Sequence, residues 1–213
     1  MWIERELTEE LRVVMQSFPA VVIHGPRQTG KTSLVERTFP TAELVSLDAG
    51  SNAEMAETRP LDFLAAHPPP VILDEVQYAP ALLRHLKAAI DAHRPASGLY
   101  VMTGSQSIAL MESVSESLAG RAAVLPLLGL SGKEWRAAVQ PAADPDWMQL
   151  LWRGTFPALW AAGEAAPSRD RWYQGYVATY VERDVRNMLG VGSLRDFERF
   201  IRACAARTAQ TLN

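Results

Sequence analysis

Apolar and polar positions follow a regular order along the first 130 residues of the chain. Residues 4–17 place apolar side chains at helical spacing, and the unbroken apolar run 20–24 follows and leads into a glycine. Spacing of three or four residues predicts an amphipathic helix, whereas a short continuous apolar run predicts a strand covered on both faces. The chain is therefore predicted to enter its core through a helix and then a central strand.

The same alternation continues beyond the first strand. Further strands are predicted at 43–47, 71–73, 99–103 and 122–127, with helices clearest at 81–93 and 107–118. Alternating strands and helices predict right-handed βαβ crossovers and a mostly parallel sheet with helices on both faces. The predicted class is α/β, with ligands at the carboxyl ends of the strands.

The pattern changes in the last third of the chain, where Pro141 and Pro145 interrupt the alternation. A long helix is then predicted at 169–189, with its apolar side chains on one stripe. We interpret residues 1–131 as a core domain and residues 132–213 as a small helical lid or adaptor. The last helical pattern has no closing glycine or proline, so we expect the natural protein to continue further.

Composition narrows the class of protein. The 213 residues, 48% of them hydrophobic, suffice for a substantial core, and the net charge of −3 provides no general attraction to nucleic acid. Cys204 is the only cysteine, which excludes an internal disulfide. The chain shows neither a secretory signal nor a membrane span. We therefore expect a cytoplasmic protein without membrane contact, and its protein or DNA partner stays open.

A phosphate-binding loop is predicted between the first strand and the next helix. It reads Gly25, Pro26, Arg27, Gln28, Thr29, Gly30, Lys31, Thr32, and Ser33 follows. Glycines let successive N–H groups converge on phosphates at a helix N-terminus, Lys31 reaches the β- and γ-phosphates, and the Thr32 hydroxyl ligates Mg²⁺. The alternative is a glycine-rich turn that fits the pattern by chance. No Asn-Lys-x-Asp run for guanine is present.

Two adjacent acids end the predicted strand 71–73. Asp74 is placed to hold the Mg²⁺ shell, and Glu75 is placed to orient and deprotonate a water that attacks the γ-phosphate. The alternative is a solvated strand end. A kinase that transfers phosphate to a small substrate is a further alternative, although the acidic pair favours water as the acceptor.

Three more polar residues lie at predicted strand ends. Ser105, with Thr103 as second choice, could sense the γ-phosphate or the attacking water, or could cap the next helix. Arg121 precedes the last strand, where it could reach a neighbouring subunit's nucleotide as an arginine finger within a homo-oligomer. Its alternative is a surface ion pair.

The remaining charged candidates carry less chemistry. Arg183 and Arg186 lie on the predicted lid helix, where Glu182 can pair with Arg186 as a surface contact. The four histidines lack metal-ligand spacing, and Asp48 is a weak candidate at a strand end.

Five motifs together resemble a known family. They are Gly-Pro-Arg-Gln-Thr-Gly-Lys-Thr (25–32), Leu-Asp-Glu-Val-Gln (73–77), Thr-Gly-Ser (103–105), Leu-Ala-Gly-Arg (118–121) and Tyr-Val-Glu-Arg-Asp-Val (180–185). The chain resembles the AAA+-type P-loop ATPases of bacteria and archaea, whose core precedes a winged helix and a nuclease-like domain of unknown function. The resemblance implies the strand order 5-1-4-3-2 and ATP as the nucleotide. It also implies that the winged helix would begin about where this sequence stops.

The resemblance also bears on the site, since it implies the same roles for Lys31, Thr32, Asp74, Glu75 and Ser105. It supports a finger at Arg121 more than the local residues do. Two functions follow from these observations: an Mg²⁺-dependent ATPase, in which Glu75 activates water, and a nucleotide-dependent switch with little or no turnover.

Overall fold

The structure, a computed structural model, describes residues 2–105, 114, 116–139, 147–160, 168–180, 193–208 and 210. Five of the described segments are strands: β1 (Ala20–Gly25), β2 (Glu43–Ser46), β3 (Val71–Asp74), β4 (Tyr100–Ser105) and β5 (Ala122–Pro126). They form one sheet in the order β2-β3-β4-β1-β5, and each neighbouring pair is parallel. The predicted α/β class and strand order are confirmed.

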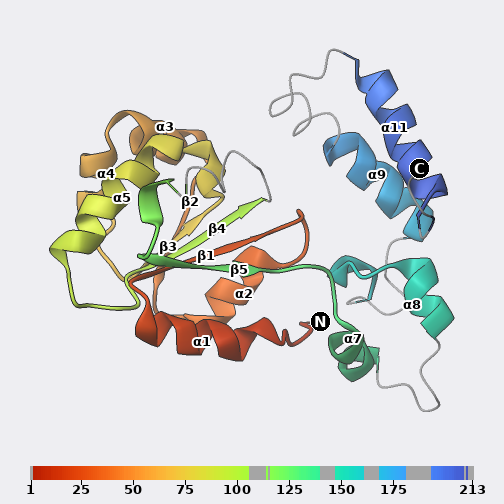
Figure 1. Cartoon of the computed structure of the whole chain (residues 1–213), viewed down its shortest axis with the longest axis horizontal. Coiled ribbons are helices and arrows are strands. Elements are labelled where there is room, and N and C mark those ends of the chain that lie inside the picture. The colour runs from red at the N-terminus through yellow and green to blue at the C-terminus, as the bar shows by residue number, and fades with distance from the viewer. Residues whose placement is uncertain are drawn as a thin grey trace. The chain divides into compact units, whose positions relative to one another are not determined.

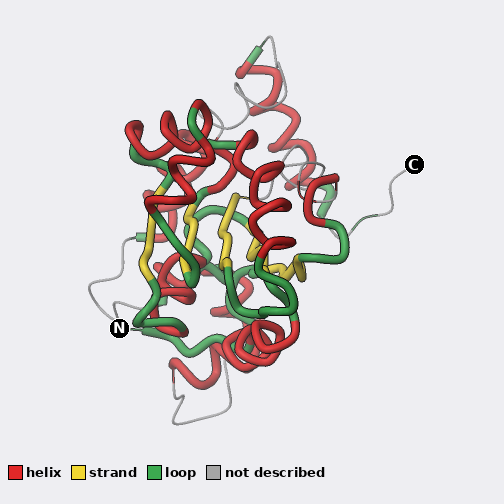
Figure 2. The backbone as a smooth tube through the Cα atoms, turned by 90° about the vertical axis from the view of Figure 1, so that its left-hand side faces the viewer, coloured by secondary structure: helices red, strands yellow, loops and turns green. Residues whose placement is uncertain are grey.

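Helices flank this sheet on both faces. The helices of the first part of the chain are α1 (Leu7–Ser17), α2 (Lys31–Thr38), α3 (Gly50–Thr58), α4 (Pro60–Ala66) and α5 (Pro80–Ala92), with a 3-10 turn η1 (Val76–Tyr78) after β3. Figure 1 shows α1 and α2 on one face of the sheet and α3, α4 and α5 on the other. In Figure 2 the strands stand side by side between helices.

The central strand β1 is covered by helices on both faces, which explains its unbroken apolar sequence. Val22 packs into a cluster with the helices on one face, whereas Val21 and Ile23 pack into a second cluster on the other. Leu83 of α5 lies in the first cluster and Leu34 of α2 in the second. Since successive side chains of a strand point to opposite faces, both faces of β1 must be apolar.

Two helices, α3 and α4, were not predicted from the pattern of the sequence. Each contributes only one fully buried side chain, Ala56 from α3 and Phe63 from α4, so neither carries a long apolar stripe. Of the predicted helix 107–118, Val114 and Leu118 are described, and both are buried in the core. The rest of that helix lies mainly outside the described residues.

The chain divides into two compact units, Met1–Ala166 and Pro167–Asn213. In the first unit, α7 (Gly132–Val139), α8 (Trp147–Arg153) and the 3-10 turn η2 (Pro157–Leu159) follow the sheet. Hydrogen bonds tie this stretch together, including one of 2.6 Å from the Leu130 N–H to the Thr155 carbonyl.

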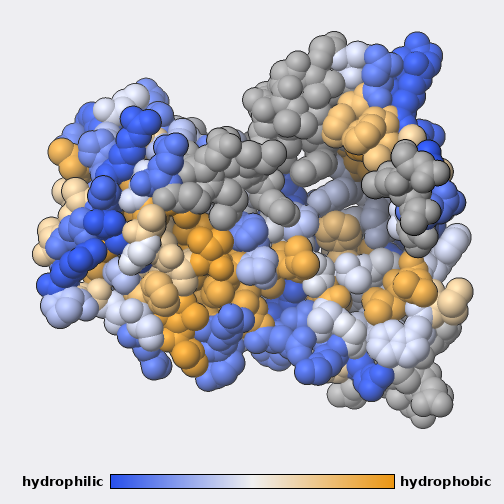
Figure 3. Space-filling view, viewed as in Figure 1, coloured by the Kyte–Doolittle hydropathy of each residue, from blue (hydrophilic) through white to orange (hydrophobic). Residues whose placement is uncertain are grey.

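Hydrophobic residues also reach the surface over α1 and β5 (Figure 3), where Val13 and Val124 are exposed.

The described part of the second unit consists of α9 (Arg169–Tyr180) and α11 (Leu194–Ala206). The predicted helix 169–189 begins as expected at α9, while Arg183 and Arg186 lie outside the described residues. Among the residues that the structure covers, no helix is both long and apolar enough to cross a membrane.

Candidate nucleotide-binding site

The loop between β1 and α2 has a backbone that few residue types adopt. Gly30 has a φ of 90°, and Gln28 has a φ of 62° although it carries a side chain. Gly25 is required for space, because a Cβ there would lie 2.1 Å from the Leu127 carbonyl oxygen. The loop ends at the N-terminus of α2, where unpaired backbone N–H groups and the helix dipole favour an anion.

Lys31 lies almost completely buried at the start of α2. Its ammonium donates hydrogen bonds to the carbonyl oxygens of Gly25 at 3.1 Å and Pro26 at 2.9 Å. Burial lowers the pKa of Lys31, and the charges of Glu75 and Asp74 oppose that shift. A buried ammonium with these partners is suited to an anionic ligand such as a phosphate.

Asp74 ends β3 directly beside the phosphate loop. The Thr32 hydroxyl donates to its carboxylate oxygens at 2.9 and 3.1 Å, and the Thr103 hydroxyl donates to the same carboxylate. Burial raises the pKa of Asp74, although the hydrogen bonds from Thr103 and Thr32 oppose the rise. A buried carboxylate beside a hydroxyl is the kind of oxygen donor set that Mg²⁺ takes. These residues therefore fit that ion.

Glu75 follows in a sparsely populated left-handed conformation, with φ 60° and ψ 48°. Its carboxylate accepts hydrogen bonds from the Ser105 hydroxyl at 3.2 Å and from the Gln77 amide. The side-chain amide oxygen Oε1 of Gln77 also accepts from the Ser105 N–H at 3.3 Å. Strain of this kind in a non-glycine residue is typical of functional sites. It turns the carboxylate toward the end of β4.

Arg121 lies at the opposite end of the strands from the phosphate loop. Its carbonyl accepts from the Ala20 N–H, which places it at the amino end of β1, whereas the loop lies at the carboxyl end. Strand β1 spans roughly 17 Å at the usual rise per residue. The guanidinium forms a two-bond ion pair with Asp91 at 2.8 and 2.9 Å. The predicted finger thus cannot reach the nucleotide of its own chain.

Several residues that contact this site were not among the predicted site residues. Tyr78 is one of them: its hydroxyl accepts a hydrogen bond of 3.0 Å from the predicted loop residue Arg27, which connects the phosphate loop to the turn after Glu75. Gln77 stands in a recognised motif, so its position gave a signal. No motif marks Arg5 or Glu134, because Arg5 contacts the loop across a long stretch of sequence and Glu134 contacts Arg5 rather than the loop. Asp48 is exposed after β2.

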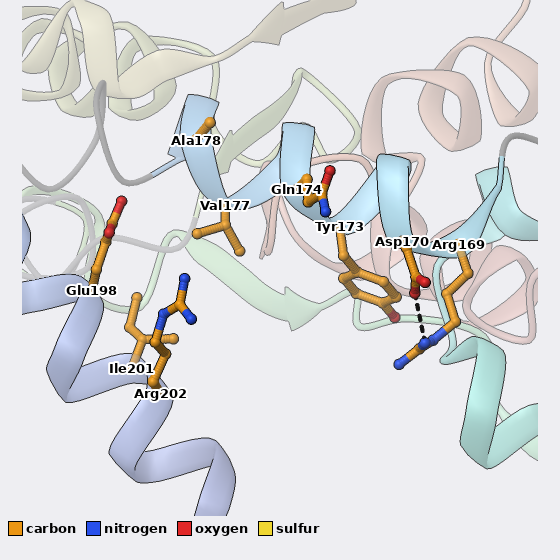
Figure 4. A pocket seen from close by; sticks show the side chains of 9 residues that line it. All are labelled: Arg169, Asp170, Tyr173, Gln174, Val177, Ala178, Glu198, Ile201 and Arg202. Carbon is orange, nitrogen blue, oxygen red and sulfur yellow. Dashed lines mark hydrogen bonds and ion pairs between the residues drawn. The ribbon is translucent and has the colours of Figure 1, made fainter.

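A cavity of about 460 Å³ lies in the second unit, between α9 and α11. Figure 4 shows Val177 and Ile201 in its wall and the ion pair between Arg169 and Asp170 at one end, 2.7 Å long. Its lining mixes apolar and oppositely charged side chains. No residue of the predicted nucleotide site is among the described residues that line this cavity.

Comparison with known proteins agrees with this geometry. Residues 17–135 match AAA_14, described as an AAA domain, and residues 144–213 match DUF8612, a domain of unknown function. The chain is 32% identical over 186 residues to the uncharacterized proteins Rv2008c of Mycobacterium tuberculosis and Mb2031c of Mycobacterium bovis. The match takes in 86% of the chain and 40% of each relative, so the chain spans well under half of their length.

Among solved structures, the chain is similar to the Walker-type ATPase PABY2304 of Pyrococcus abyssi. The TM-score is 0.56 at 14% identity, and the match covers 97% of this chain and 77% of the other. At that identity the likeness concerns the fold alone.

Proposed function

Because the chain belongs to the AAA_14 family of AAA domains, we propose that it binds ATP with Mg²⁺ and hydrolyses it to ADP and phosphate. One observation carries the proposal. The phosphate loop, the Thr32–Asp74 pair and Glu75 lie together at the carboxyl ends of the strands. We further propose that hydrolysis is coupled to a conformational change or to the handling of a partner.

Binding uses groups that are already in place. The loop N–H groups and the α2 N-terminus receive the phosphates, and Lys31 exchanges its two loop carbonyls for phosphate oxygens. Thr32 and Asp74, which share a hydrogen bond of 2.9 Å, would hold Mg²⁺. When bound, this ion neutralises charge on the phosphates. Residues 25–33 thus form the nucleotide-binding segment.

Hydrolysis depends on Glu75. Its carboxylate takes a proton from a water molecule, the water oxygen bonds to the γ-phosphorus, and the bond from that phosphorus to the ADP oxygen breaks. Ser105 contacts the Glu75 carboxylate and so orients it for this step. Lys31 stabilises the negative charge on the transferred group.

A second function, a nucleotide-dependent switch with little turnover, is favoured by a separate observation. In this structure the Glu75 carboxylate also accepts from the Gln77 amide, and Arg121 is paired with Asp91. Both groups would have to change partners before they could act on a nucleotide. A chain that holds ATP in this arrangement changes shape or partner without hydrolysis.

Glu75→Gln tests the proposal. We expect the variant to bind fluorescent ATP with Mg²⁺ within about threefold of the wild-type affinity, since the amide keeps the shape of the side chain. Phosphate release should fall by about a hundredfold or more, because the general base is lost. Glu54→Gln on the exposed face of α3 is the matched control and should leave both quantities unchanged.

The outcomes separate the two functions when turnover is measured across protein concentrations. Equal, merely residual phosphate release from wild type and Glu75→Gln would refute the ATPase. Tight binding with no phosphate release at any concentration, together with an ATP-dependent change in oligomeric mass, would establish the switch instead.

A further inference from the structure

Arg5 contacts the phosphate loop from outside it. The side chain is buried, and its Nη1 donates a hydrogen bond of 2.6 Å to the Thr29 carbonyl oxygen. That carbonyl and the N–H of Gly30 belong to one peptide group, and in a trans peptide they point in opposite directions. A bond that fixes the Thr29 carbonyl therefore also fixes the direction of the Gly30 N–H.

The Arg5 guanidinium is itself held on two further sides. Nη2 donates to the carbonyl oxygens of Leu128 at 2.8 Å and Gly129 at 3.2 Å, in the segment after β5. Nε lies 3.0 Å from a carboxylate oxygen of Glu134, and both side chains of this ion pair are at most 5% exposed. A planar guanidinium can satisfy several acceptors at fixed angles, which an ammonium cannot do.

Glu134 is anchored in turn within the first turn of α7. One carboxylate oxygen also accepts from the Glu6 N–H at 2.7 Å, and the other accepts from the Ser131 N–H at 2.8 Å. The Ser131 hydroxyl accepts from the Glu134 N–H at 3.1 Å, which completes a capping box. The phosphate loop is thus connected through two buried side chains to a helix that begins about a hundred residues later in the chain.

We infer that Arg5, held by Glu134, is a positioning residue that aims the Gly30 N–H at a nucleotide phosphate. The inference rests on the proposed function for the identity of the ligand, whereas the control of the loop backbone stands on the contacts alone. If Arg5 acts in this way, nucleotide affinity depends on the position of α7, whose first turn carries Glu134. A purely structural pair would instead hold the fold together and leave the affinity of folded protein unchanged.

The test uses the full chain with Arg5→Lys and Glu134→Gln. Lysine keeps the charge but loses the directed bonds, and glutamine keeps the helix cap while it removes the ion pair. Arg12→Lys is the matched control, because Arg12 is an exposed residue of α1 paired only with Glu9 among the described ion pairs. Binding of fluorescent ADP with Mg²⁺ is measured below the unfolding temperature of each variant.

We expect Arg5→Lys to weaken ADP binding about tenfold and Glu134→Gln to weaken it severalfold, with Arg12→Lys within twofold of wild type. Amide exchange in nucleotide-free protein gives a second readout. The Leu34 N–H bonds to the Gly30 carbonyl at 2.9 Å, so a loosened Thr29–Gly30 peptide should speed exchange in the first turn of α2.

Each result decides one claim. Folded variants with wild-type affinity and wild-type exchange overturn the inference, even if they melt earlier. Failure of the wild type to bind nucleotide refutes the proposed function, while the exchange measurement still decides whether Arg5 controls the loop. If Arg5→Lys does not fold, Glu134→Gln decides the same question alone.

Discussion

Lys31 and Asp74 are buried ionisable residues beside the phosphate loop. Burial shifts both pKa values toward the neutral form, downward for the lysine and upward for the aspartate. A domain optimised for stability alone would not bury these charges beside a loop of unpaired N–H groups. Their cost to folding is explained if the missing stabilisation comes from a charged ligand, as the Mg²⁺–ATP proposal requires.

Asp74→Asn should therefore make the nucleotide-free protein more stable at neutral pH. The folded state raises the pKa of Asp74, so it binds the proton more tightly than the unfolded chain does. Stability then falls as pH rises from the ordinary aspartate pKa through the raised value, and the loss persists above it. We expect a gain of a few degrees in Tm at neutral pH that shrinks on acidification, together with loss of Mg²⁺-dependent nucleotide binding.

Asp91→Asn provides a control of opposite sign. The hydrogen-bonded Arg121 guanidinium lowers the pKa of Asp91, so its contribution is present above the ordinary aspartate pKa and is lost as pH falls. This variant should melt slightly earlier than wild type at neutral pH. If Asp74→Asn also melted earlier there, burial would not be the dominant influence on its carboxylate.

At the scale of elements, α7 is held by its cap and by the ion pair that enters its first turn. Ser131→Ala removes the hydroxyl that accepts from the Glu134 N–H and donates to Glu6 at 2.6 Å. Loss of an N-cap hydroxyl costs about 1 kcal/mol. We expect urea unfolding of the first unit to report a loss of that size, and Ser131→Thr, which keeps a capping hydroxyl, to recover most of it. Equal losses in both variants would contradict the capping role.

Elements with strong patterns were predictable and weakly patterned ones were not. The strands β1 and β5 follow from continuous apolar runs, and α5 follows from Leu82, Leu86 and Ile90 on one buried face. The short helices α3 and α4 gave no such pattern, since each buries one side chain fully. Their helical state depends on packing against the sheet, which no local window of sequence contains.

The site divides in the same way. Lys31, Asp74 and Ser105 come together because Lys31 follows the loop after β1, and Asp74 and Ser105 end β3 and β4 of the same parallel sheet. The hydrogen bond from Gln77 to Glu75 depends on a left-handed backbone that a glutamate rarely adopts. Arg5 reaches the loop across 24 positions of sequence, so only the folded structure reveals the contact.

In the whole molecule, the parallel sheet separates the phosphate loop from Arg121. The phosphate loop lies at the carboxyl ends of the strands and Arg121 at the amino end of β1, so an arginine finger can act only on a nucleotide held by another chain. Such a contact joins unlike surfaces of two copies, and its repetition closes into a ring or grows into a filament. Arg121 must also leave Asp91 to take part.

Mixing two inactive variants tests this arrangement. Lys31→Ala removes a nucleotide site but leaves Arg121, and Arg121→Ala removes the finger but leaves the site. If the finger acts between chains, the mixture should release phosphate faster than either variant alone, by at least about tenfold if fingers act as elsewhere. As a control, Lys31→Ala protein is mixed with Arg84→Ala protein, in which an exposed arginine of α5 is replaced. A mixture no faster than the sum of its parts would assign Arg121 to the Asp91 ion pair alone.

The position of β1 in the sheet also fixes an order of events during synthesis. This strand carries the phosphate loop, yet its two partners, β4 and β5, leave the ribosome much later than β1 itself. The Leu127 backbone that abuts Gly25 and the Glu134 carboxylate that holds Arg5 emerge later still. Nascent chains shorter than this have no completed site, so nucleotide can assist only the last stage of folding, after the distant segments have docked.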